Sequence, residues 1–306
     1  MKWIDAEAVA KAAPHEDVIE ALRKGFCEAI TAPVRHHHAT GPATTLLLMP
    51  AWSKDWTGLK TLTLKSDNDA LGLPAIQAVY TLIDNATGTP VVMMDATELT
   101  RRRTAGTSAL AADYLARPDA GTLVLFGAGS LAPHFALAHA AVRPIKTVLI
   151  VNRTRARAEQ AAAEIAALGF AARAAEAEEA VKQADIISCM TSSVAPLFKG
   201  AWLRPGTHID LVGAYTPKMR ETDAEAVARS EVYVDTHEVA RAEAGDLIQA
   251  EAEGKFSFDC VKGDLAELCG GKVKGRGGAS EITLFKSCGA ALEDLVAAEL
   301  VYRKSA

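Results

Sequence analysis

The segment from residue 121 to residue 154, GTLVLFGAGSLAPHFALAHAAVRPIKTVLIVNRT, constrains the fold more than any other part of the chain. Its first apolar run, 123–126, has the length of a strand that is buried on both faces. A short turn of small residues follows, and a Cβ atom at its glycines would obstruct an approaching phosphate group. This turn consists of Gly127, Ala128 and Gly129.

The residues after the turn predict a helix and then a second buried strand. The Ala- and Leu-rich stretch from Ser130 to about Ala141 has helical character, and Val148–Val151 is again apolar. Ala132 supplies the third small residue of a dinucleotide fingerprint. Strand, glycine turn, helix and strand together form the unit that binds a pyrophosphate at a helix N-terminus. The alternative is a glycine turn in an ordinary α/β protein.

The end of the second strand predicts which coenzyme is preferred. Sites selective for NAD place Asp or Glu there to accept a hydrogen bond from the ribose 2′-hydroxyl. This chain has Asn152, Arg153 and Thr154 instead, and a guanidinium can pair with a 2′-phosphate. The sequence therefore predicts NADPH as the preferred coenzyme over NADH, unless Arg153 merely faces solvent.

Composition excludes several classes of protein. The 306 residues suggest two domains, and the net charge of −5 and the absence of a basic run longer than 101–103 argue against nucleic-acid binding. Five scattered cysteines form no CxxC pair, which favours reduced thiols and the cytoplasm, and no apolar run has the length of a membrane span. The consecutive His36, His37 and His38 point to alternate faces of an extended segment, so we expect no metal site.

The remaining segments predict a sheet before the nucleotide unit and further strands after it. Residues 5–30 predict a helix that is interrupted near Pro14, and the apolar runs between 44 and 96 predict an antiparallel or mixed sheet. A helix is expected from about Thr97. The apolar runs at 184–192, 208–214 and 231–235 predict further parallel strands, and 285–303 predicts a final helix.

Several separated motifs resemble the ornithine cyclodeaminase/mu-crystallin superfamily. They are LLLMPAW, GLK, TGTPVVMMDATELTRRRTAGTSALAADYLA, VNRT, GAYTPKMRETD and EITLFKSCGAALEDLVAAELVY. The resemblance implies an α/β protein in which a Rossmann-type doubly wound nucleotide domain is inserted into an α+β substrate and dimerisation domain. The expected boundaries are 116–284 for the NAD(P)-binding domain and 1–115 plus 285–306 for the other. The resemblance also implies a homodimer.

The superfamily carries several reactions on one scaffold, so the resemblance leaves the activity open. Some members convert ornithine to proline with recycled NAD, and others reduce cyclic ketimines or interconvert pyruvate and alanine. A further branch binds thyroid hormone. We therefore keep four readings: a cyclic ketimine reductase, an ornithine cyclodeaminase, an alanine dehydrogenase-like enzyme and a non-catalytic ligand-binding protein.

The resemblance assigns five residues to the substrate. Arg35, Lys60 and Arg103 stand where the family binds the substrate carboxylate, and an ammonium or guanidinium suits that partner. Lys60 is also the expected catalytic residue, by contact with the carboxylate or by relaying a proton. Gln77 falls where some members place a Thr near the carboxylate, although it is as well explained as a strand-surface residue. Tyr215 is the fifth.

The expected cofactor-binding residues come from the fingerprint, from the end of the second strand and from the end of a later strand. Thr191 and Ser192 should lie at the carboxyl edge of the parallel sheet, where they either contact the cofactor or cap the strand. The complete set is Thr104, Gly127, Ala128, Gly129, Ser130, Leu131, Asn152, Arg153, Thr154, Arg157, Thr191 and Ser192.

Tyr215 distinguishes between the enzymatic readings. The family's cyclodeaminases carry an Asp at this place, two residues after the glycine, and that Asp is thought to handle protons during ring closure. A phenol cannot replace a carboxylate as a base near neutral pH without a large perturbation of its pKa. The sequence therefore favours NAD(P)H-dependent reduction of a small cyclic imino acid, such as 1-pyrroline-2-carboxylate or 1-piperideine-2-carboxylate, to proline or pipecolate.

Overall fold

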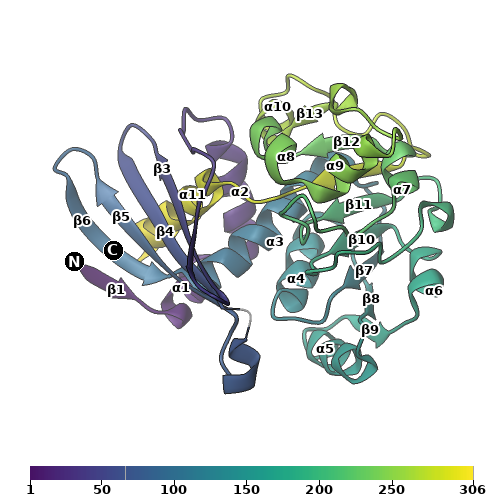
Figure 1. Cartoon of the computed structure of the whole chain (residues 1–306), viewed down its shortest axis with the longest axis horizontal. Helices are drawn as coiled ribbons and strands as arrows, with labels where there is room; N and C mark the ends of the chain where they lie inside the picture. Colours follow the sequence, from purple (N-terminus) through teal and green to yellow (C-terminus); the bar gives the residue numbers. More distant parts are fainter. Residues whose placement is uncertain (66, 306) are drawn as a thin grey trace. The chain divides into compact units, whose positions relative to one another are not determined.

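The computed structural model describes residues 1–65 and 67–305, which form two compact units (Figure 1). The first unit comprises Met1–Thr104 and Ala290–Ala306, and the second comprises Ala105–Gly289. The sequence placed the first boundary after residue 115. In the structure the boundary falls inside helix α3 (Ala96–Leu115), which continues from one unit into the other. Linkers between domains are often marked by Gly or Pro, but the residues of a continuous helix carry no such mark. The sequence therefore gives no signal for a boundary inside α3.

The first unit is built on a six-stranded sheet in the order β1-β6-β5-β4-β3-β2. Its neighbouring strands are antiparallel, except that β1 runs parallel to β6. The strands are β1 (Lys2–Ile4), β2 (His36–Gly41), β3 (Thr44–Trp52), β4 (Trp56–Lys65), β5 (Ile76–Asp84) and β6 (Thr89–Asp95). The other elements are α1 (Ala6–Ala12), α2 (His15–Gly25), the 3₁₀ turn η1 (Asn68–Leu71) and α11 (Ala291–Lys304). The mixed sheet and the interruption at Pro14 are as predicted.

One face of this sheet is covered by helices. Every second residue of the central strands is buried, including Met49, Leu62 and Leu82, because side chains alternate between the faces of a strand. Helix α11 packs against β3, β4 and β5 on this side and is itself covered by α2 (Figure 1). The two helices approach closely at Gly25, where a Cβ would lie 2.3 Å from Val296 Cγ2.

The opposite face of the same sheet carries several apolar side chains that are only partly covered, together with polar ones such as Thr61 and Gln77. Leu46, Leu48, Leu59, Val79 and Met93 alternate with the fully buried residues and are half-buried. An antiparallel sheet in water normally exposes polar residues on its open face. Neighbouring apolar side chains that remain partly exposed are typical of a surface that another protein chain covers.

The second unit is a parallel eight-stranded sheet in the order β13-β12-β14-β11-β10-β7-β8-β9, which confirms the predicted Rossmann-type α/β class. The strands are β7 (Thr122–Phe126), β8 (Thr147–Val151), β9 (Ala171–Ala174), β10 (Ile186–Cys189), β11 (His208–Leu211), β12 (Glu231–Val234), β13 (Gly263–Asp264) and β14 (Thr283–Lys286). The helices are α4 (Ala132–Val142), α5 (Arg155–Ala167), α6 (Ala177–Val181), α7 (Ala224–Ala228), α8 (His237–Glu243), α9 (Gly245–Ala252) and α10 (Leu265–Cys269), with 3₁₀ turns η2 (Gly200–Trp202) and η3 (Phe258–Cys260).

The strand order reverses between β7 and β10. Chain progression runs outward from β7 through β8 to β9 on one side, and from β10 to β11 on the other. Ligands of open α/β sheets bind outside the carboxyl ends of the strands at such a switch point. This fold therefore positions a site beside Gly127 and Thr191, which follow the ends of these two strands.

The prediction of one continuous helix over 285–303 is wrong. Thr283–Lys286 forms β14, which pairs in parallel with β11 and β12 and is fully buried. The helix begins only at Ala291, after Gly289, whose φ of +82° interrupts the regular backbone. A four-residue strand is too short to show a period that separates a buried strand from a helix. No helix in the described part of the chain has the length and apolar character needed to cross a bilayer.

Candidate functional site

Lys60 is held by a buried carboxylate in the first unit. It lies on β4 directly opposite Tyr80 of β5, on the face covered by α11. Its Nζ lies 2.7 Å from Oδ2 and 2.9 Å from Oδ1 of Asp294, which is in the first turn of α11. Neither side chain is more than 1% exposed. The strand pairing and the helix together fix the position of this ammonium group.

Arg103 reaches the same carboxylate from α3. Its Nε donates to Asp294 Oδ1 at 2.9 Å, and its Nη1 lies 2.6 Å from Glu293 Oε2. Glu293 is fully buried and also accepts a hydrogen bond from the backbone N–H of Ala290. Two cations and two carboxylates therefore form one buried network, which we call the cation cluster: Lys60, Arg103, Glu293 and Asp294.

Burial and neighbouring charges shift the pKa values in the cation cluster. Burial lowers the pKa of Lys60 to about 8; the positive charges of Arg103 and Arg35 act in the same direction, while Asp294 opposes them. Burial alone would raise the pKa of Asp294, but Arg103 and Lys60 outweigh it and the pKa is lowered. Lys60 therefore remains protonated near neutral pH but can lose its proton in mildly basic solution.

Arg35 lies close enough to the cation cluster to affect the ionisation of Lys60. It is half-buried, in the segment that leads into β2. Lys60 and Arg103 thus share one carboxylate, and the charge of Arg35 acts on Lys60 from nearby. A guanidinium offers a planar fork of donors and an ammonium offers a compact charge, and both suit a small carboxylate ligand.

The other two predicted substrate residues lie elsewhere. Gln77 is exposed and pairs with Thr63, so the alternation along β5 puts it on the opposite sheet face from Lys60. Tyr215 belongs to the second unit, where it follows β11 and packs against the hydrophobic core. The structure therefore does not group Gln77 with the cation cluster.

A pocket of about 630 Å³ lies at the carboxyl edge of the second unit's sheet. It is lined by predicted cofactor residues from three separate segments: Gly127, Asn152, Arg153, Thr154, Arg157, Thr191 and Ser192. The loops after β7, β8 and β10 supply them, as expected for a doubly wound sheet. Ala128, Gly129, Ser130 and Leu131 form the adjoining turn into α4, whereas Thr104 lies on α3 in the first unit.

The turn after β7 fits a dinucleotide. Gly127 has a φ of +115°, and a Cβ there would lie 3.2 Å from the carbonyl oxygen of Met190. A Cβ at Gly129 would meet no atom within 4 Å, so its missing side chain leaves open space beside the start of α4. Ala132 is fully buried at that helix end. Open backbone at a helix N-terminus is what a pyrophosphate requires.

The part of this pocket that follows β8 is rich in arginine. Arg153, Arg155 and Arg157 are all exposed and line it. Arg155 pairs with Glu159 at 2.9 Å and approaches Glu176 at 3.5 Å. Glu176, after β9, was not predicted from the sequence. It is the one acidic residue among the described residues that line this pocket.

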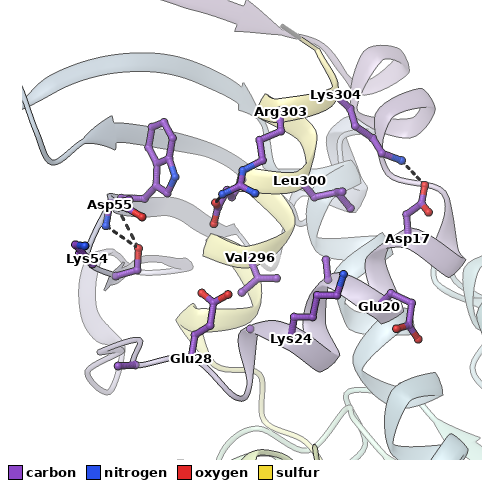
Figure 2. A pocket seen from close by; sticks show the side chains of 16 residues that line it. Asp17, Glu20, Lys24, Glu28, Lys54, Asp55, Val296, Leu300, Arg303 and Lys304 are labelled. Carbon is purple, nitrogen blue, oxygen red and sulfur yellow. Dashed lines mark hydrogen bonds and ion pairs between the residues drawn. The ribbon is translucent and has the colours of Figure 1, made fainter.

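Another pocket, of about 560 Å³, lies between α2, α11 and the turn before β4 (Figure 2). Its rim carries mixed charges, and Figure 2 shows Lys304 paired with Asp17 at its edge. Both of these side chains are about two-fifths exposed. It contains none of the predicted site residues, and its exposed ion pairs contrast with the buried cation cluster. We therefore keep two candidate sites, each within its own unit: the cation cluster in the first unit and, in the second, the pocket beside β7, β8 and β10, which we call the dinucleotide pocket.

The sequence prediction did not identify the carboxylates of the cation cluster. Glu293 and Asp294 are adjacent acids in the first turn of a helix whose first ten residues are otherwise mostly apolar, with Leu292 and Leu295 on either side. Charged residues are almost never fully buried unless they are paired. An acidic pair on the buried side of an apolar stripe is the signal that could have identified them.

Comparisons with known proteins extend along the whole chain. A model of the ornithine cyclodeaminase/mu-crystallin family matches residues 5–306. The Delta(1)-pyrroline-2-carboxylate reductase of Colwellia psychrerythraea is 35% identical over 315 residues and is matched over 100% of both chains. The solved structure of the Thermococcus litoralis Delta(1)-pyrroline-2-carboxylate reductase in complex with NADH and L-proline has a TM-score of 0.96 at 33% identity, over 100% of this chain and 97% of that one. An archaeal alanine dehydrogenase dimer with bound NAD has a TM-score of 0.93 at 28% identity, over 99% and 95%.

Proposed function

Because the chain belongs to the ornithine cyclodeaminase/mu-crystallin family, we propose that it is an oxidoreductase that uses a nicotinamide coenzyme to reduce a small cyclic imine bearing a 2-carboxylate. The substrates of choice are 1-pyrroline-2-carboxylate and 1-piperideine-2-carboxylate, which give proline and pipecolate. The observation that carries this proposal is the pair of buried cations, Lys60 and Arg103, held by one carboxylate. The similar reductases from Colwellia and Thermococcus support it.

The cation cluster accounts for recognition of the substrate carboxylate. Asp294 restrains Lys60 and Arg103 at the same time, so little side-chain freedom is lost when an anion binds. The cations act in buried surroundings, where electrostatic attraction is stronger than in water. The bound coenzyme supplies the hydride, and the substrate nitrogen can arrive protonated, which makes the imine carbon electrophilic. Lys60, with a pKa of about 8, is the candidate to contact the carboxylate or relay a proton.

Tyr215 argues against the cyclodeaminase reaction. Conversion of ornithine requires loss of ammonia and attack of the distal amine, and both steps need a group that exchanges protons near the reacting nitrogen. A phenol stands where the family's cyclodeaminases keep an Asp. Reduction of a preformed cyclic imine needs one hydride step and no release of ammonia, so it makes a smaller demand on this position.

The proposed coenzyme preference is NADPH over NADH. The support is Arg153 at the rim of the dinucleotide pocket, together with the absence of an acidic residue in the segment 151–154. The similar structures contain NADH and NAD, which support a nicotinamide coenzyme in general. Charge-assisted hydrogen bonds from Arg153 to a 2′-phosphate would distinguish NADPH.

We also propose a homodimer that works in the cytoplasm. The half-buried apolar side chains on the face of the six-stranded sheet opposite α11, such as Leu48 and Val79, support the dimer, as does the dimeric state of the alanine dehydrogenase to which the chain is similar. The cysteines are scattered along the chain and form no CxxC pair, which is consistent with a reducing compartment.

The proposed reaction is tested by the near-ultraviolet absorbance of the reduced coenzyme. Either cyclic imine alone should consume NADPH, and proline or pipecolate should accumulate in equal amount. Consumption only with pyruvate plus ammonia would favour an alanine dehydrogenase-like enzyme, and proline with ammonia from ornithine and catalytic NAD would favour a cyclodeaminase. No turnover with any of these substrates would support a ligand-binding protein instead.

A further inference from the structure

Glu221 is a buried carboxylate that joins two loops at the carboxyl edge of the parallel sheet. It lies between β11 and α7 and is fully buried. Its Oε1 accepts hydrogen bonds from the backbone N–H of Thr191 at 2.7 Å and from the Thr191 hydroxyl at 2.9 Å. Its Oε2 accepts from the backbone N–H groups of Gly213 at 2.7 Å and Ala214 at 3.2 Å. One side chain thus receives four donors from two loops.

These two loops continue from strands that have stopped pairing with each other. The β10–β11 ladder ends at Cys189 and Leu211, and one further bond runs from Val212 to Cys189. Beyond it the loops touch, since a Cβ at Gly213 would lie only 2.0 Å from the carbonyl oxygen of Thr191. The carboxylate of Glu221 therefore links the two backbones by hydrogen bonds where the β10–β11 ladder has ended but the backbones are still in contact.

A second buried ion pair holds the backbone of Glu221. Asp246 of α9 accepts from the backbone N–H of Glu221 at 2.7 Å through Oδ1, and its Oδ2 lies 3.1 Å from Nζ of Lys286 of β14. The other ionisable groups on the packed elements are Cys189 of β10, Asp210 of β11 and Cys288 after β14. Burial raises the pKa of the Cys189 thiol well above its usual value, so this neighbour is neutral.

The location of these loops gives Glu221 a functional context. Thr191 lines the dinucleotide pocket, and the loops after β10 and β11 leave the sheet on the side where the strand order reverses. Tyr215 follows Ala214 directly. A change in either loop would therefore move a residue of the coenzyme pocket or the position that separates reductase from cyclodeaminase.

We infer that Glu221 is a positioning residue whose carboxylate clamps the loops after β10 and β11 in the form that binds the coenzyme, and that protonation of this carboxylate releases the clamp. The inference rests on the proposed function for its connection to the coenzyme. A protonated carboxyl group must place a hydrogen on one oxygen, and each of the two oxygens already faces two donors. A proton on Oε2 faces two backbone N–H groups that can only donate, so it breaks a contact with the loop after β11. A proton on Oε1 can be donated to the Thr191 hydroxyl, which reverses that hydrogen bond and leaves a weaker acceptor for the Thr191 N–H.

The relevant pH range is close to neutral. Burial raises the pKa of Glu221 to about 7; Lys286 opposes this shift, and Asp246 adds to it. Coenzyme affinity should therefore fall when the pH changes from one unit above this value to one unit below it. The amide N–H groups of Thr191, Gly213 and Ala214 should lose protection against hydrogen exchange over the same range.

The test uses Glu221→Gln, which keeps the shape of the side chain but turns an NH₂ group toward N–H donors. The dissociation constant of NADPH, measured by its fluorescence, should rise roughly tenfold, as for loss of one charge-assisted hydrogen bond, and should no longer depend on pH near neutrality. Exchange protection of the three amides, corrected for intrinsic rates, should fall at every pH. The matched control is Glu225→Gln, an exposed residue on α7 that should retain wild-type affinity and pH dependence.

Glu221→Asp is the second variant, in case the amide variant does not fold. It keeps the charge and shortens the side chain, so weaker coenzyme binding should persist together with its pH dependence. Wild-type affinity and pH dependence in Glu221→Gln would overturn the inference. So would equal protection of the three wild-type amides above and below the pKa. If wild-type protein bound neither NADPH nor NADH, the proposed function would fail, whereas amide exchange would still decide whether the clamp exists.

Discussion

The Nζ atom of Lys60 lies 2.7 Å from Oδ2 of Asp294, although 234 residues separate them in the chain. The pair joins β4 of the first sheet to the last helix, α11. Arg103 shares the carboxylate, so one acid holds two of the predicted substrate cations. The carboxylate that orients the site is therefore supplied by the C-terminal end of the chain.

Asp294→Asn should strongly destabilise the protein. The variant leaves Lys60 and Arg103 buried with one carboxylate, Glu293, instead of two. Breaking one partner of a buried ion pair typically costs about 3–5 kcal/mol in the free energy of unfolding. Urea unfolding followed by circular dichroism measures this difference.

The exposed pair of Asp17 with Lys304 provides the control. Asp17→Asn also removes a carboxylate from a lysine, but in solvent, where an ion pair contributes less than about 1 kcal/mol. Equal effects of the two substitutions would show that the cation cluster does not depend on Asp294.

Lys60 should give opposite pH trends in activity and stability. Its pKa in the folded protein is about 8, below the value of 10.5 for an ordinary lysine. Above pH 8 the folded protein loses a proton that the unfolded chain still binds, so this residue's contribution to the free energy of unfolding rises with pH up to about 10.5. The same loss of charge weakens carboxylate binding, so kcat/KM for the cyclic imine should fall, approaching tenfold per pH unit.

Lys60→Arg separates this effect from titration of the substrate. A guanidinium stays protonated throughout this range, so the basic limb of the kcat/KM profile should move to higher pH if Lys60 produces it. A limb at the same pH in both proteins would assign it to the substrate nitrogen instead.

The nucleotide unit could be predicted because its signals are local. The predicted helix from Ser130 to Ala141 corresponds to α4, Ala132–Val142, and the flanking strands are β7 and β8. Gly127 needs its positive φ for a turn that spans only a few residues. Such information is contained in a short stretch of sequence.

The partners of the site residues could not be predicted because they depend on distant contacts. Glu293 lies 190 residues from Arg103, and only the packing of α11 on the sheet brings them together. The side of the sheet on which Gln77 lies depends on the strand register, since a shift of one residue exchanges the faces. The strand β14 was missed because its pairing with β11 joins segments that are far apart in sequence.

Arg153→Ala should reduce the preference for NADPH. Loss of a charge-assisted contact to the 2′-phosphate should lower kcat/KM for NADPH by roughly tenfold and leave the value for NADH nearly unchanged. Arg173→Ala is the matched control, because Arg173 is an exposed arginine of the same unit that pairs with Glu179 outside the pocket. A wild-type enzyme with equal kcat/KM for both coenzymes, unaltered by Arg153→Ala, would refute the role of this residue.

Leu48→Lys should separate the proposed dimer into monomers. Leu48 is half-buried on the face of the first sheet opposite α11, paired with Thr61 of β4, and a charged residue buried in a protein interface is costly to desolvate. Light scattering should report twice the chain mass of 32.3 kDa for the wild type and the mass of a single chain for the variant.

Leu168→Lys is the control for a new surface lysine. Leu168 is an exposed residue of the second unit, so this substitution should leave the dimer intact. A wild-type particle of one chain mass would contradict the dimer, and a dimeric Leu48→Lys variant would place the interface on another surface.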